Sequence, residues 1–262
     1  MQKKHYLLIL GAAAWLGACQ SDPVQPGASA TDLPAWAEEI DRASLIGGPE
    51  LVDCTLSGGA KTKCVSLTMK PKPASLDIGP FCPRHIDDGP EQSGLWLNDG
   101  KMYDADGAFI KNLSTFYGDD NWQLYDPVTG KINVTDTKLS CEAAARPDVA
   151  PEYQNHCVEC DMSYLPDGQS TTYVIPVVPQ AAAQIAPRVD HGGVGLALNG
   201  ARLDAAAPID AILAAYTIAA FDDCGGHINP NVGYHIHAVT DCLTGTRVNE
   251  NHAPRIGIAM DG

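Results

Sequence analysis

Short runs of alternating apolar and polar residues make up most of this chain of 262 residues, and Gly, Pro, Asn or Asp ends most of the runs. Alternation over about four to eight residues is typical of half-buried β-strands, and no long stretch follows the helical period of about 3.6. We therefore expect a mostly β fold, either all-β or α+β with short helices. Antiparallel sheets or a sandwich, stapled by disulfides, would agree with this pattern.

Three hairpins are expected, each with a glycine in its turn. Asp99-Gly100 and Asn199-Gly200 are typical two-residue hairpin turns, and a Ser-Gly-Gly sequence turns the third hairpin. The expected hairpins join 51–56 to 64–69 and cover 96–103 and 194–204. The other expected elements are strands at 171–178, 233–239 and 255–260, a short helix at 208–216, and a loop or short helix at 140–150.

A targeting segment begins the chain. Lys3 and Lys4 precede an apolar run at 7–16 that is too short for a stable membrane-spanning helix. The following Leu-Gly-Ala-Cys sequence resembles a bacterial lipobox, which implies cleavage before Cys19 and acylation of that residue. An ordinary secretory signal is the alternative. The resemblance, together with Gln20 at the next position, leads us to expect an exported lipoprotein of the outer membrane, facing the periplasm or the cell surface.

The chain is expected to have four parts. These are a signal peptide at 1–18, a flexible tether at 19–48, a Cys-rich β region at 49–170 and a C-terminal β region at 171–262. The last two regions could form one fold. The final Asp-Gly pair is a turn signal, so we expect the domain to continue beyond it.

The charge of the chain excludes one class of partner. The formal net charge is −15, and removal of residues 1–18, which contain two lysines and no acidic residue, makes it −17. Such a chain repels nucleic acid and anionic lipid headgroups. We therefore expect no nucleic-acid partner and membrane contact through the lipid anchor only. Whether a protein or a glycan is a partner stays open.

Cysteine usage agrees with export. Eight cysteines remain besides Cys19, and an even number in an exported chain implies up to four disulfides. The simplest pairing joins neighbours in the sequence and leaves one long-range bridge, which gives Cys54–Cys64, Cys157–Cys160, Cys224–Cys242 and Cys82–Cys141. A redox role for the Cys-x-x-Cys pair is the alternative.

Three of the eight histidines lie within eleven residues, at His227, His235 and His237. Neutral imidazole is the commonest metal ligand in proteins, and a His-x-His pair on a strand directs both rings to one face. Three imidazoles and an open position suit zinc or copper. His252 and His191 are candidates for a fourth ligand. The alternative is that these rings only form hydrogen bonds in a Gly-rich region.

Asp222 and Asp223 precede this segment and are the candidate catalytic residues. Either one could orient an imidazole or serve as general base to a metal-bound water. Three functions therefore stay open: a metal-binding protein of unassigned activity, a metal-assisted hydrolase, and a structural or binding module of the cell envelope without a metal. The chain has no Gly-x-Ser-x-Gly nucleophile motif, phosphate-binding loop or dinucleotide-binding glycine pattern.

The same segment resembles a known family. The residues Gly233-Tyr-His-Ile-His237, which follow Cys224-Gly-Gly-His227, are similar to the hallmark of the YHYH-domain family of exported bacterial proteins. Ile236 stands where the second tyrosine of the hallmark would be. The resemblance implies that 171–262 is a YHYH-like domain, and it assigns no activity.

Overall fold

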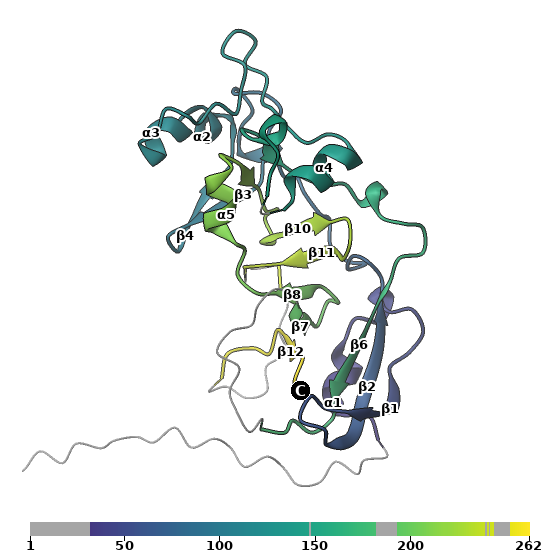
Figure 1. The fold of residues 1–262 in the computed structure, drawn as a ribbon. Helices are drawn as coiled ribbons and strands as arrows, with labels where there is room; N and C mark the ends of the chain where they lie inside the picture. Colours follow the sequence, from purple (N-terminus) through teal and green to yellow (C-terminus); the bar gives the residue numbers. More distant parts are fainter. Residues whose placement is uncertain (1–31, 147, 182–192, 239, 241, 244–251) are drawn as a thin grey trace, which may run out of the picture.

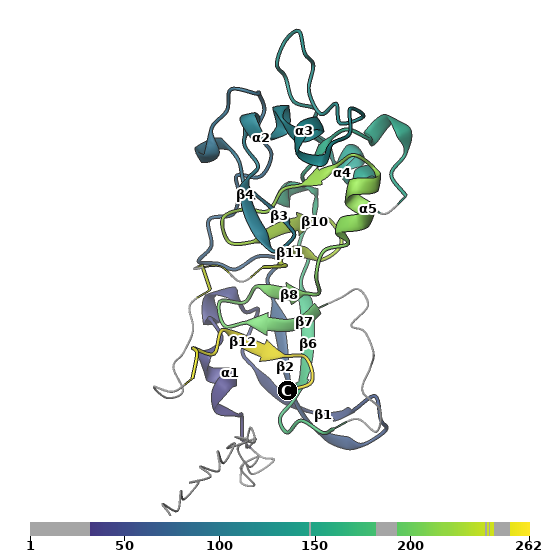
Figure 2. The ribbon, with the colours of Figure 1, turned by 90° about the vertical axis from the view of Figure 1, so that its left-hand side faces the viewer.

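The computed structural model of the protein describes residues 32–146, 148–181, 193–238, 240, 242–243 and 252–262. It is mostly β with a few short helices, as predicted, and the sheets and helices form an elongated molecule (Figures 1 and 2). The α-helices are α1 (Ala35–Glu39), α2 (Gly107–Lys111), α3 (Leu113–Tyr117), α4 (Lys138–Ala144) and α5 (Ile209–Ala214). Short 3-10 helices span Arg42–Ser44, Pro90–Gln92, Pro151–Tyr153 and Met162–Tyr164. None of the helices in the described ranges combines the length and apolar character that a membrane crossing requires.

Two sheets carry most of the fold within the described residues. A five-stranded sheet has the order β10-β11-β8-β7-β12 and runs through the middle of the molecule, and a three-stranded sheet has the order β1-β2-β6 (Figure 1). The first sheet consists of β7 (Gly193–Ala197), β8 (Arg202–Asp204), β10 (Gly226–Asn229), β11 (Gly233–Ile236) and β12 (Gly257–Ala259). The second consists of β1 (Glu50–Thr55), β2 (Lys61–Met69) and β6 (Thr171–Pro176).

Two smaller pairs complete the described strands. The hairpin β3 (Leu95–Asn98) and β4 (Lys101–Asp104) is antiparallel, whereas β5 (Cys157–Val158) and β9 (Ile218–Ala219) are parallel. The pair β8 and β11 is parallel as well. The β2–β6 and β5–β9 pairs both join segments on opposite sides of residue 171, so strands from the two regions share sheets.

The predicted hairpins are confirmed. Their turns use the expected glycines, and Asp99 and Gly100 both have positive φ angles, as a type I′ turn requires. Helix α5 begins after Pro208, as predicted. Strand β10 was not predicted, because Gly-Gly and Asn-Pro at its two ends indicate turns rather than a strand.

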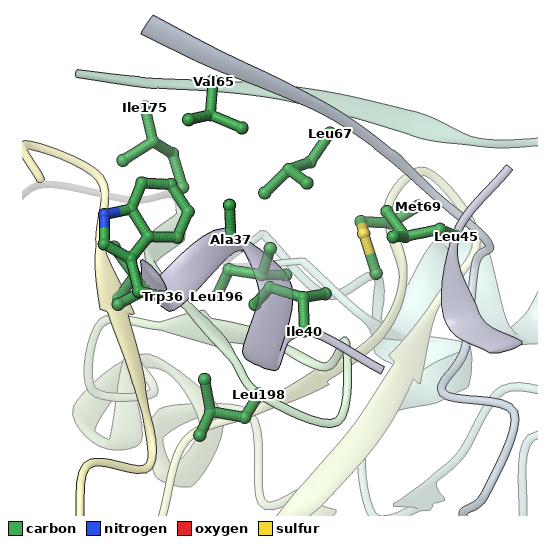
Figure 3. Close-up of a cluster of buried hydrophobic side chains, with 11 residues drawn as sticks. Trp36, Ala37, Ile40, Leu45, Val65, Leu67, Met69, Ile175, Leu196 and Leu198 are labelled. Atoms are coloured by element: carbon green, nitrogen blue, oxygen red, sulfur yellow. The ribbon is translucent and has the colours of Figure 1, made fainter. Parts of the chain in front are cut away.

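One hydrophobic cluster lies between the two large sheets (Figure 3). Helix α1 contributes Trp36 and Ala37 to this cluster, and its C-cap residue Ile40 joins them against side chains of β2, β6 and β7. The tether expected at 19–48 is therefore wrong for its C-terminal part. The reason is the apolar face of α1 formed by Trp36 and Ala37. Burying this face against the sheets stabilises a helix of only five residues.

All eight cysteines from Cys54 onward form disulfides, but only two of the predicted pairings are confirmed. The bridges are Cys54–Cys64, Cys82–Cys157, Cys141–Cys160 and Cys224–Cys242. The expected pairs Cys157–Cys160 and Cys82–Cys141 are wrong. Cys157 lies in the extended strand β5 and Cys160 follows that strand, and Cys157 meets Cys82 whereas Cys160 meets Cys141 on α4. This also excludes a redox pair at Cys-x-x-Cys.

Candidate metal centre

The hairpin of β10 and β11 brings the three clustered histidines together. His227 on β10 lies directly opposite His235 on β11, and directly opposed residues of an antiparallel pair project to the same face. His237 follows two residues later on that face, because side chains alternate along an extended chain. The predicted His-x-His geometry is thus confirmed, and strand pairing supplies the third ring.

The three imidazoles meet at close range. The ring centroids are 4.6 Å apart for His227 and His235, 5.1 Å for His227 and His237, and 4.9 Å for His235 and His237. One ligand nitrogen from each ring lies within 4.8 Å of the others. The Nε2 atoms of His227 and His235 are 3.0 Å apart. Two nitrogens bound to one tetrahedral zinc at about 2.0–2.1 Å would be about 3.3 Å apart, which is close to this separation.

Backbone carbonyls orient two of the rings. His235 Nδ1 lies 3.2 Å from the Gly233 carbonyl oxygen, and His237 Nδ1 lies 2.5 Å from that of Ala205. A carbonyl only accepts, so each Nδ1 carries the proton and each Nε2 keeps its lone pair. Histidine ligands of metal sites are oriented in this way by a partner of the second nitrogen. The rings therefore present lone pairs toward one shared position.

Burial keeps the cluster neutral. Phe221 is fully buried and packs on the rings of His227 and His237, at centroid distances of 5.1 and 5.6 Å. Burial lowers the pKa of His227 well below its ordinary value, and the neighbouring His235 and His237 rings lower it further. Burial also lowers the pKa of His235 to about 4, and it lowers the pKa of His237. Neutral imidazole is the form that binds metals, so the cluster is ready for a cation at pH 7.

The aspartates that the sequence offered as catalytic groups lie elsewhere. Asp222 Oδ1 accepts hydrogen bonds from the backbone N–H groups of Cys224 and Gly226, at 3.1 and 3.0 Å, and from the Tyr234 hydroxyl at 3.0 Å. Tyr234 points to the face of β11 opposite that of His235, and the side chain of Asp223 is exposed. Within the described residues, no hydrogen bond or ion pair joins Asp222 or Asp223 to the three imidazoles, so a role as base for either stays a prediction. Burial raises the pKa of the Asp222 carboxyl group. The hydrogen bonds of this group hold the two strands of the hairpin together.

The carboxylate beside the cluster is Asp204, which the sequence analysis missed. Its Oδ2 atom lies 4.0 Å from His235 Nε2, and its Oδ1 atom accepts a hydrogen bond from Arg202 Nε. The parallel pairing of β8 with β11 brings it there, with Arg202 opposite His235. Sequence spacing carries no signal for a parallel pairing between strands about thirty residues apart.

The other histidines in the described part of the chain do not belong to the cluster. His252 is exposed and lies outside the group of three, so the structure does not bring it in as a fourth ligand. His191 lies outside the described residues. His85 and His156 approach the backbone carbonyls of Thr129 and Gln154 instead.

Comparison with known proteins identifies the part of the chain that holds this cluster. Residues 172–262 match the family model described as YHYH protein. This C-terminal part of the chain is a YHYH domain. No curated protein and no solved structure matches the chain significantly. All three clustered histidines lie within the YHYH domain, and Ile236, at the position that departs from the hallmark, is buried in a hydrophobic cluster on the opposite face of β11.

A cavity of about 600 Å³ opens in front of the three histidines. The YHYH domain supplies one part of its wall, including Asp204 and α5 residues Ala211 and Ile212. The preceding region supplies the rest, from Phe81, α4 and the segment around β5. Pockets of about 300–1,000 Å³ are typical of small-molecule sites. The histidine cluster therefore faces a space that a small molecule can enter.

Proposed function

We propose that this protein is an exported, lipid-anchored protein that binds one copper or zinc ion through His227, His235 and His237. The observation that carries this proposal is the convergence of three imidazole nitrogens within 4.8 Å of one another. Two of the rings are already oriented by backbone carbonyls for this task. Without a metal ion, the Nε2 atoms of His227 and His235, 3.0 Å apart, would share a hydrogen bond, which a bound ion would replace.

The donor set favours these two metals. Imidazole nitrogen suits zinc and copper, whereas calcium and magnesium prefer oxygen ligands. A thiolate ligand is unavailable among the described residues, because each described cysteine is bonded to another. Three protein ligands with an open side toward a cavity resemble catalytic zinc sites more than closed structural sites.

Elemental analysis tests the metal site. The protein is purified from the detergent-solubilised membrane fraction without a histidine tag, treated with chelator, and titrated with zinc and with copper. We expect about one equivalent of metal, lost in a His235→Ala/His237→Ala variant and kept in a His252→Ala variant. The last variant is the matched control, because His252 is exposed and outside the cluster. No metal in the wild-type protein after reconstitution would leave a structural or binding module as the better function.

The lipid anchor is tested separately. The lipobox resemblance assigns acylation to Cys19, and the acidic chain offers no basic patch for an anionic membrane. We expect radiolabelled palmitate on the wild-type protein and none on a Cys19→Ser variant, which should also leave the outer-membrane fraction. Label that remains on the Cys19→Ser variant would contradict acylation at this residue.

A second candidate function is metal-assisted ester hydrolysis, which the position of Asp204 favours. A bound metal ion would lower the pKa of a water that enters the cavity. Asp204 Oδ2, 4.0 Å from His235 Nε2, is placed to take the proton of that water. The water oxygen would add to the ester carbonyl carbon, the ester C–O bond would break, and Asp204 would return the proton to the leaving alcohol.

Hydrolysis of p-nitrophenyl butyrate by the zinc-loaded protein tests this candidate. Loss of a general base typically costs about 100-fold or more in rate. We therefore expect an Asp204→Asn variant to keep its zinc and lose about 100-fold of the hydrolysis rate. An Asp223→Asn variant is the control, because this exposed side chain is not placed at the cluster. No hydrolysis by the wild-type protein would exclude this candidate and leave metal binding intact.

A further inference from the structure

We infer that the cavity in front of the histidine cluster binds a small carboxylate with an apolar tail. The carboxylate head binds, as a fourth ligand, the metal ion held by His227, His235 and His237, and the tail lies along the alanine-rich wall. This inference rests on the proposed metal function, because the metal ion is the group that the head binds. The wall, the charges and the ligand set each support it.

Small apolar side chains make up a large part of the cavity wall, beside the histidines and several polar and charged residues. Its larger apolar members are Phe81, Val158, Ile212 and Ile228, and the wall contains seven alanines. Small side chains leave room for a tail while still excluding water from its surface. The alanines are Ala144, Ala145, Ala205, Ala206, Ala207, Ala211 and Ala219.

The charges around the cavity do not repel an anion, although the whole chain carries a net charge of −15. The two acidic residues of the wall are both paired with arginines, Asp204 with Arg202 and Glu159 with Arg84. Arg146 adds a cation and is the one Lys or Arg among the described lining residues. Arg146 Nε lies 3.4 Å from Oδ1 of Asp148, which is outside the cavity, and both of these side chains are exposed.

The ligand set also favours an anionic fourth ligand. Three neutral imidazoles leave the full charge of a divalent metal uncompensated, and a charge in an apolar surrounding is costly unless it is paired. Asp204 compensates this charge incompletely, because its other oxygen is bound to Arg202. A carboxylate supplies the missing negative charge and an oxygen ligand together.

Cobalt(II) and a series of fatty carboxylates test the inference. Cobalt(II) replaces zinc in the full mature protein and gives a visible spectrum that changes with its ligands. Acetate, butanoate, hexanoate and octanoate are then titrated, with calorimetry on cobalt-loaded and metal-free protein. Each buried methylene should tighten binding by about fourfold, the equivalent of about 0.8 kcal/mol. Metal-free protein should bind octanoate at least about tenfold more weakly, because it lacks the metal ion that the carboxylate head binds; tenfold corresponds to about 1.4 kcal/mol.

Filling the cavity should remove the dependence on chain length. Ala211→Trp places a large ring in the cavity from α5, and Ala214→Trp is the matched control, because Ala214 is exposed on the same helix and does not line the cavity. We expect the Ala211→Trp variant to bind cobalt and acetate normally and to lose the preference for octanoate.

The outcomes separate the two proposals. Equal affinity for acetate and octanoate in the wild-type protein, or equal octanoate affinity with and without cobalt, would overturn the carboxylate site and leave metal binding in place. This comparison uses the wild-type chain and does not depend on the folding of a variant. Failure of cobalt to bind at all would instead contradict the metal function, and the carboxylate inference would fall with it.

Discussion

The metal-free protein should lose stability as the pH falls from 7 to 5, because its histidine cluster is buried in the neutral form. Burial lowers the pKa of His235 from its ordinary 6.5 to about 4. A histidine with a lowered pKa in the folded state contributes stability that is fully present above pH 6.5. This contribution is lost progressively as the pH falls toward about 4, since the unfolded chain then binds the proton more readily.

The size of this loss follows from linkage. Between pH 7 and pH 5 an unfolded histidine gains most of a proton, whereas folded His235 gains only about a tenth of one. The difference costs about 2 kcal/mol of unfolding free energy for this residue alone. The pKa values of His227 and His237 are also lowered by burial, so they add losses in the same direction.

Urea denaturation of chelator-treated protein at pH 7 and pH 5 measures the effect. A change of about 2 kcal/mol moves the urea midpoint by about 1 M for a typical denaturant slope. A His235→Gln variant should show a pH dependence that is smaller by at least about 2 kcal/mol. A variant at the exposed His252, His252→Gln, should behave like the wild-type protein. Equal pH dependence in the wild-type and His235→Gln proteins would refute the reasoning.

Three further predictions concern the hairpin that carries the cluster. Tyr234→Phe removes the donor to buried Asp222 and should cost about 1–3 kcal/mol in chemical denaturation, while metal stoichiometry stays at one; an unchanged stability would contradict the role of this bond. Gly226→Ala would place a Cβ 2.5 Å from the Tyr234 ring, so the hairpin that carries the histidines would have to shift. We expect weaker zinc binding in calorimetry, and an affinity equal to that of the wild type would contradict this. Replacing Cys224 and Cys242 by Ser opens a loop with a separation of 18 residues and should lower the unfolding free energy by about 3 kcal/mol; a loss below about 1 kcal/mol would refute this.

Local patterns in the sequence predicted the parts of the site that depend on neighbouring residues. The alternation at Tyr234-His-Ile-His237 predicted which rings share a face, and the structure places them there. Turn chemistry predicted the hairpins, because Asp99-Gly100 adopts positive φ angles with little strain. These signals act over a few residues and need no knowledge of the rest of the fold.

The remaining parts of the site depend on contacts between distant segments. Asp204 reaches His235 through a parallel strand pair, and nothing near either residue encodes that pairing. The bridge Cys82–Cys157 spans 75 residues, so proximity in the sequence gave the wrong partner for Cys157. Asp222 was proposed as a catalytic group because it lies close to the histidines in sequence, whereas its carboxylate is bonded to Tyr234, on the face of β11 opposite His235.

The buried Asp222–Tyr234 pair explains why the histidines face the cavity. The Asp222 carboxylate accepts the Tyr234 hydroxyl and the N–H of Gly226, and so connects both strands of the hairpin on its core face. A slip of one residue in this pairing would exchange the two faces of β11, moving Tyr234 into the cavity and His235 into the core. Such a slip would break the hydrogen bond from Tyr234 to this buried carboxylate, and unsatisfied buried polar groups are costly. The aspartate therefore acts on the histidine cluster through strand register.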